Sequence, residues 1–131
     1  MSIKKDFNRQ SPIVATVEFA LADVASGVDQ PAIDLPPGAV ILSGDVVTTQ
    51  AWDSTTSDVI DVGDAGSQNR YLNDGNFRAL GARVPLVPTG YMHTGGPLTV
   101  RWTSGGGTPT TGKARLTVEY IILGRSCSTH G

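Results

Sequence analysis

Side chains able to do acid–base or nucleophilic chemistry are few in this chain of 131 residues. It contains two histidines, His93 and His130, one cysteine, Cys127, and two glutamates, Glu18 and Glu119. Catalysis by such groups needs a base within hydrogen-bond reach of a nucleophile or a second acid. The sequence has no Gly-x-Ser-x-Gly motif, and two glutamates leave little for paired-carboxylate chemistry. We therefore predict that the protein is not an enzyme.

Two groups of residues carry metal-ligand chemistry. Zinc sites take about four ligands, and the terminal Cys127 and His130 lack a second ligand pair apart from His93. A calcium site built from separate loops would use aspartates, but their spacing fails the EF-hand pattern and no glutamate closes the loop. Solvated turn residues are the default interpretation, and we predict no metal and no cofactor. The aspartates concerned are Asp58, Asp61, Asp64 and Asp74.

The segment Gly107–Ala114 matches the phosphate-binding P-loop except at its last position, where Ala114 replaces the Ser or Thr that reaches magnesium. A P-loop also needs a helix after it, so that amides at the helix start hold the phosphate. A strand pattern follows here instead. The segment is therefore interpreted as a hairpin tip.

Four aromatic residues could form a sugar-stacking platform, as in β-sandwich carbohydrate modules. The alternative is that they belong to the core, since Trp102 alternates with Val100 in a strand pattern and Trp52 ends another strand. Both interpretations stay open at this point. The four are Trp52, Tyr71, Tyr91 and Trp102.

The elements that would position these residues are strands. Sixteen Gly, eight Pro and only three Lys are a poor composition for surface helices. Apolar residues alternate with polar ones over 13–21 and 114–123. Further strands are expected over 39–50, 57–62, 70–72, 84–87 and 98–103, and the interior Ser43-Gly44 indicates a bulge or a bend in the first of these. Seven to eight short strands predict an antiparallel β-sandwich of jelly-roll type.

The connections follow from the turn residues. We expect 31–38 to be an extended connection, because proline supplies no ladder donor. Asn73-Asp74-Gly75 is expected to form a turn. The strands 98–103 and 114–123 are expected to pair as a hairpin with a long flexible tip. The organisation is then a polar arm with a flexible character over 1–11, one domain over 12–123 and a tail over 124–131.

Charge is unevenly distributed although its net value is only −2. The range from Asp23 to Asp74 contains nine aspartates and one cation, Arg70. The range from Arg78 to Arg125 contains six cations and one acidic residue, Glu119. The two halves either attract neighbouring copies or partners, or neutralise each other inside one fold. Because the net charge is small and no long apolar run is present, we predict that the protein binds neither nucleic acid nor a membrane. With one cysteine and no signal peptide, we expect assembly in a reducing cytoplasm.

Four segments together resemble small virion proteins of tailed bacteriophages. They are the run Ile33–Gly44 with its Pro36-Pro37-Gly38, the loop segments Asp61–Ala65 and Asn69–Leu72, and the closing run Gly112–Ile121. The resemblance covers about residues 30 to 123, and its motifs are structural rather than catalytic.

The resemblance implies a capsid decoration, or cement, protein on the outer surface of the virion. Such a protein would clamp adjacent major capsid subunits and associate with itself as a dimer or trimer. The arm and the tail would become ordered on binding, with Lys4, Lys5, Arg9 and Arg125 as partner-binding residues. The alternative is a receptor- or carbohydrate-binding virion module that uses Trp52, Tyr91 or exposed loops.

Overall fold

The computed structural model describes residue 3 and residues 8–124. Eight strands and one short 3₁₀ turn make up its regular structure, so the predicted all-β fold is confirmed. In chain order the elements are β1 (Ile13–Ala20), η1 (Leu21–Asp23), β2 (Val28–Leu35), β3 (Ala39–Gln50), β4 (Asp58–Gly63), β5 (Leu72–Asn76), β6 (Arg83–Pro85), β7 (Gly96–Ser104) and β8 (Lys113–Ile122).

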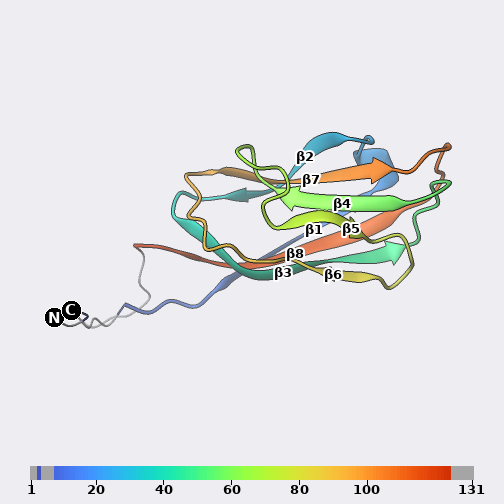
Figure 1. The fold of residues 1–131 in the computed structure, drawn as a ribbon. Coiled ribbons are helices and arrows are strands. Elements are labelled where there is room, and N and C mark those ends of the chain that lie inside the picture. Colours follow the sequence, from blue (N-terminus) through green and yellow to red (C-terminus); the bar gives the residue numbers. More distant parts are fainter. Residues whose placement is uncertain (1–2, 4–7, 125–131) are drawn as a thin grey trace.

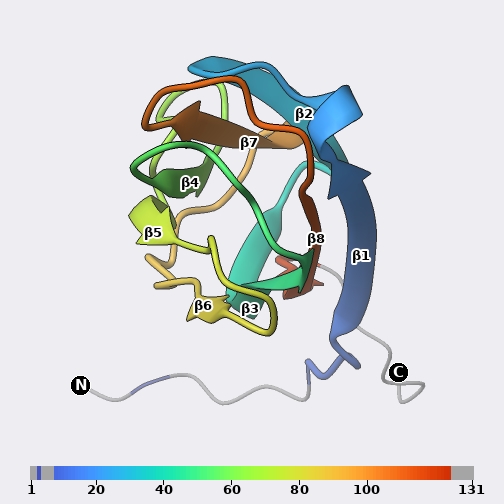
Figure 2. The ribbon, with the colours of Figure 1, turned by 90° about the vertical axis from the view of Figure 1, so that its right-hand side faces the viewer.

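The strands form two four-stranded sheets that pack face to face (Figure 1). One sheet has the order β1-β8-β3-β6 and the other β2-β7-β4-β5, and all strand pairs are antiparallel. Figure 2 views the sandwich along its strands, with β1 at one edge of its sheet. Eight strands arranged so that the first pairs with the last are the jelly-roll form of the β-sandwich, which confirms the predicted architecture.

The period-two pattern of β8 decides which side chains enter the core. Ala114, Leu116, Val118 and Tyr120 are buried, while the alternating residues face outward. From the opposite sheet, Leu98, Val100 and Trp102 of β7 meet them. An antiparallel strand with one buried face has this alternation, so the orientation predicted for β8 is confirmed.

A bulge in β3 keeps both halves of that long strand in the core. The register against β8 shifts between Ile41 and Ser43. Ala39 and Ile41 are buried before the shift, and Val46 and Thr48 are buried after it. One extra residue reverses which side chains face inward. Of the bulge or bend expected at Ser43-Gly44, the structure has a bulge, one residue earlier, at Leu42, whose side chain is 40% exposed.

The expected extended connection over 31–38 is wrong for its first part, because residues 28–35 form β2. Pro31 lies inside this strand, opposite Thr99 of β7. The strand is at the edge of its sheet, and its register shifts between Pro31 and Ile33. An edge strand with a bulge is the place where a sheet accepts proline, since the missing N–H is not needed by a second neighbour.

The hairpin expected between 98–103 and 114–123 is also wrong. β7 pairs with β2 and β4, whereas β8 pairs with β1 and β3 in the other sheet. The connecting loop crosses between the sheets and is hydrogen-bonded to the loop after β3. Asp53 accepts from the backbone N–H of Thr110 at 2.7 Å, and Thr55 donates its N–H to Gly106 at 2.9 Å.

The turn expected at Asn73-Asp74-Gly75 lies within β5 instead. Asp74 does adopt the left-handed backbone that favours turns, with φ of 53°. Its N–H is held by the Asp61 carboxylate at 2.6 Å, so the irregular residue is kept within a short edge strand.

The uneven charge is neutralised inside the fold at three places. Arg78, Arg83 and Arg101 of the basic half form ion pairs with aspartates of the acidic half. The partners are Asp58, Asp45 and Asp29, respectively. For these three pairs the second interpretation of the charge asymmetry is confirmed.

Candidate functional site

The reactive side chains gather at one end of the sandwich, in loops that flank β4, β5 and β7. The Tyr71 Oη and the His93 Nε2 share a hydrogen bond of 2.6 Å. The other ring nitrogen of His93 lies 3.8 Å from an Asp64 oxygen. Arg70 donates to both Asp64 oxygens, at 2.6 and 3.2 Å, and its guanidinium lies 3.6 Å from the centre of the Tyr91 ring.

The environment of this cluster, which we call the Tyr71–His93 cluster, shifts the pKa values of three of its members. Burial raises the pKa of Tyr71 to about 12, so the phenol stays protonated. Burial lowers the pKa of His93, against the opposing charge of Asp64. Burial alone would raise the pKa of Asp64, but hydrogen bonds from Arg70 and the Ser67 backbone outweigh it and the pKa lies below its ordinary value.

Asp64, His93 and the Tyr71 hydroxyl are arranged one after another in space, as the acid, base and nucleophile of a hydrolase triad are. This arrangement, however, has no exposed nucleophile. The hydroxyl belongs to Tyr71, which is 2% exposed, and the neighbouring cleft holds only about 110 Å³. The His93 backbone is also bonded to the corner before β3, through the Gly38 N–H and the Ala39 carbonyl. The cluster therefore joins three loops.

Asp58 is the centre of a second buried polar cluster. Its side chain is completely buried and accepts from the Trp102 indole N–H at 2.9 Å and from the Ser54 hydroxyl at 2.5 Å. Arg78 lies 3.9 Å away and also donates to the Ser54 carbonyl. These bonds fasten the loop after β3 to the core, so Asp58 has a structural role.

The expectation that the four aspartates are solvated turn residues is wrong for three of them. Asp58, Asp61 and Asp64 are buried, because backbone or side-chain donors bind their carboxylates. Within the described residues, no three His, Cys, Asp or Glu side chains gather closely enough to hold a metal ion. Cys127 and His130 lie outside these residues.

The sugar-stacking platform does not form. Trp52, Tyr71 and Trp102 are at most 4% exposed, which confirms the core interpretation of Trp102. Trp52 packs against Phe77 and Trp102 with ring centres 4.8 and 5.4 Å apart. Of the four predicted aromatic residues only Tyr91 reaches the surface, and its face is covered by Arg70.

The P-loop match at Gly107–Ala114 does not bind in the manner of a P-loop, because strand β8 and not a helix follows it. Three hydrogen-bond donors of this segment are already bound to the Asp53 carboxylate. They are the Thr110 N–H, the Thr110 hydroxyl and the Thr111 N–H. These bonds also lower the pKa of Asp53.

A shallow groove, which we call the sheet groove, crosses the outer face of the β1-β8-β3-β6 sheet and holds about 390 Å³. Its apolar part includes Val14, 63% exposed, and Leu42, 40% exposed. Its polar margin includes Glu119 and the Asp45–Arg83 ion pair, which measures 2.7 Å. Apolar surface rimmed by polar groups is typical of a protein-binding surface.

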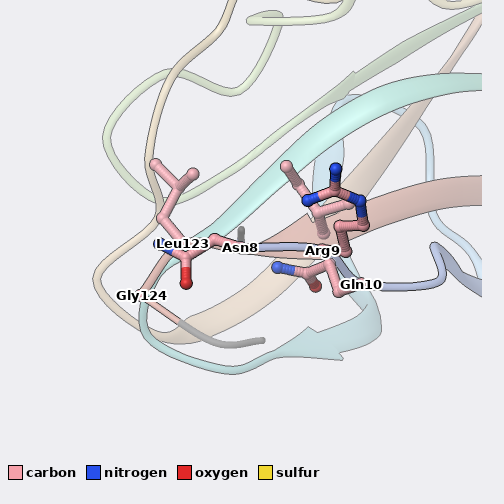
Figure 3. A pocket seen from close by; sticks show the side chains of 6 residues that line it. Asn8, Arg9, Gln10, Leu123 and Gly124 are labelled. Atoms are coloured by element: carbon pink, nitrogen blue, oxygen red, sulfur yellow. The ribbon is translucent and has the colours of Figure 1, made fainter. Parts of the chain in front are cut away.

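A second groove, the terminal groove, holds about 590 Å³ where the N-terminal segment crosses the end of β8. The Gln10 side chain bonds to both backbone groups of Ile122: its Nε2 donates to the carbonyl at 2.7 Å, and its Oε1 accepts from the N–H at 3.0 Å. The amide thus replaces a strand residue where β1 no longer pairs with β8. Figure 3 shows Arg9 and Leu123 projecting toward the same side of this groove.

Of the four predicted partner-binding residues, only Arg9 lies among the described residues, and it lines the terminal groove. Lys4, Lys5 and Arg125 lie outside them. The sequence did contain a signal for Val14, an apolar residue on the polar side of a strand. It contained none for Leu42 or Gln10, whose positions depend on the bulge in β3 and on the end of β8.

The search of protein-family models found no match, and neither did the search of curated proteins. No helix in the described part of the chain has the length and apolar character needed to cross a lipid bilayer.

Solved structures, in contrast, share the fold over most of the chain. A chain of the cyanophage Pam1 capsid asymmetric unit has a TM-score of 0.69 and 21% identity, covering 93% of this chain and 91% of that one. A chain of the acidic stable capsid of Helicobacter pylori bacteriophage KHP30 has a TM-score of 0.66 and 15% identity, covering 87% and 90%. A chain of the Ralstonia phage GP4 capsid has a TM-score of 0.59 and 17% identity, covering 96% and 92%. This protein therefore has the fold of chains that occur in phage capsids.

Proposed function

We propose that this chain is a structural protein of a bacteriophage virion that decorates the outside of the capsid and clamps adjacent major capsid subunits. The observation that carries the proposal is the shared fold with chains of three phage capsids, which extends over 87–96% of this chain.

The surface chemistry of the molecule supports a binding role without turnover. The residues suited to acid–base chemistry in the Tyr71–His93 cluster are buried and paired with one another. The sheet groove and the terminal groove, in contrast, are open at the surface of the described residues, and both are lined in part by apolar side chains. Burying such surface against a subunit is favourable, and many copies on one shell would add their contacts by avidity.

The sheet groove is the proposed shell-binding surface, and the termini extend the contact. Lys4, Lys5, Arg9 and Arg125 are proposed to meet acidic groups of the capsid or of a neighbouring copy. Self-association as a dimer or trimer, location on the outer capsid surface and assembly in the host cytoplasm are parts of the same proposal.

Co-sedimentation with undecorated shells tests the proposal. The full chain should pellet with the shells, and Val14→Asp should weaken this binding by roughly tenfold or more, because it introduces a charge in the apolar part of the sheet groove. Val28→Asp is the matched control, since Val28 is 47% exposed on the other sheet. Failure of the full chain to pellet contradicts the function. Equal binding by both variants contradicts the choice of surface.

A further inference from the structure

The four edge strands of the sandwich differ in how well they are protected from pairing with another chain. β6 is three residues long and contains Pro85, β2 contains Pro31 and a register shift, and β5 contains a register shift and the left-handed Asp74. Proline, bulges and short length are the usual means of blocking an edge.

β1 has none of these protections. It is eight residues long, contains no proline, and pairs with β8 in an unbroken register from Ile13 to Ala20. β1 lies at the end of its sheet, so one side of its backbone has no strand beside it among the described residues (Figure 2). A long and regular edge of this kind is a template for an added strand.

A groove beside this edge would receive the side chains of an added strand. It holds about 260 Å³ and lies between β1 and β2. Val17, Val24 and Ala32 supply apolar walls, while Glu18 and Asp23 supply negative charge. An extended segment with alternating apolar side chains and a basic residue matches this lining. We call the edge of β1 and this groove together the β1 site.

The N-terminal segment of the chain carries apolar residues at both ends and two lysines between them. Residues 3–7 read Ile-Lys-Lys-Asp-Phe, so that an extended backbone would direct Ile3, Lys5 and Phe7 to one face and Lys4 and Asp6 to the other. Ile3 is 94% exposed, and such a large apolar side chain gains from burial. Five extended residues span about 17 Å, which fits along the eight residues of β1.

The described residues just before β1 lie on the β8 side of this strand and not at its free edge. Gln10 holds residues 8–10 across the end of β8, next to Ile121 and Leu123. β8 is the neighbour of β1 on the side opposite the free edge. A second copy is therefore the better-placed acceptor.

We infer that the β1 site of one copy binds residues 3–7 of a second copy as an added strand, with Lys4 near Glu18. This inference rests on the self-association that is part of the proposed function, and it names the surface and the segment. Because the donor and acceptor patches differ, the contact is head-to-tail, and it closes into a ring if the rotation between copies permits.

Charge reversal in the full chain tests the contact, with sedimentation velocity over a range of protein concentrations. The wild-type chain should self-associate, and Glu18→Lys or Lys4→Glu should each weaken the association by roughly tenfold or more, since like charges then face each other. The double variant with both changes should recover most of the loss. Asp34→Lys, which reverses an exposed acid on β2 outside the grooves, should leave the association unchanged.

A fluorescent peptide of residues 1–11 provides a second measurement, by anisotropy. It should bind the full chain and should bind Glu18→Lys more weakly. A wild-type chain that stays monomeric and does not bind the peptide overturns the inference, as does a double variant without recovery. Shell co-sedimentation of the same variants separates the two proposals: a monomeric chain that still pellets with shells contradicts this contact and leaves the decoration function standing.

Discussion

The phenol of Tyr71 and the imidazole of His93 share a hydrogen bond of 2.6 Å although 22 residues separate them in the chain. The backbone of Tyr71 is also hydrogen-bonded on both sides. Its N–H donates to the Val62 carbonyl, and its carbonyl accepts from the Val87 N–H. The bond therefore joins the loop after β4 to the segment before β7, at the end of the sandwich where reactive side chains gather.

Removing the Tyr71 hydroxyl should destabilise the fold. Tyr71→Phe leaves a buried ring nitrogen of His93 without its partner, which costs about 1–3 kcal/mol of the free energy of unfolding. Urea denaturation followed by tryptophan fluorescence measures this change.

Tyr91→Phe is the control for that variant. It keeps the ring that packs under the Arg70 guanidinium, and Tyr91 is 36% exposed. Its effect should stay within about 0.5 kcal/mol. Equal effects of the two changes would show that the Tyr71–His93 bond contributes nothing specific.

The free energy of unfolding should fall as the pH is lowered through the range where histidine titrates. Burial lowers the pKa of His93 below the ordinary histidine value of about 6.5. Below that value the unfolded chain binds a proton at this position that the folded chain resists, so the free energy of unfolding falls as the pH drops from about 7.5 to about 5.5. Urea denaturation at several pH values measures the slope.

His93→Gln should flatten this slope whatever its effect on stability at neutral pH, because the substituted side chain does not titrate. The matched control is His130→Gln, which changes the other histidine of the chain. If the slope disappears in the control and persists in His93→Gln, the assignment to His93 is wrong.

Asp58→Ala should be among the most destabilising changes to a charged residue. It leaves the Trp102 indole N–H and the Ser54 hydroxyl without their acceptor, inside a site that is completely buried. We expect a loss of about 3 kcal/mol, against less than about 1 kcal/mol for Asp45→Ala, which removes a surface ion pair with Arg83. Thermal denaturation that ranks the two in the opposite order would contradict the role of Asp58.

Gly112→Ala should destabilise the loop before β8. A Cβ atom there would lie 2.4 Å from ring atoms of Trp52, which is packed in the core. Overpacking of this kind costs about 1–3 kcal/mol. At Gly66 an added Cβ meets its nearest neighbours at 3.4 Å, so Gly66→Ala should cost less than about 1 kcal/mol. Thermal denaturation of both variants checks the difference.

Local pattern predicted a large part of the fold. Alternation assigned the buried and exposed faces of β8, and Ser43-Gly44 indicated the bulge in β3, because side-chain period and glycine act over a few residues. The sequence interpretation failed where a distant partner changes the meaning of a residue. Pro31 is a strand residue only because β2 is an edge, and Asp58 is buried only because Trp102 and Ser54 bind it.

The sequence by itself determined the all-β class, the orientation of the most regular strands and the scarcity of groups able to catalyse a reaction, since these follow from composition and period. Only the tertiary structure decided that β7 and β8 belong to different sheets and that Val14 and Leu42 line one groove. It also decided that the Gln10 amide binds the backbone of Ile122, across 112 residues of chain. Such contacts depend on pairings between distant segments, and local patterning does not specify them.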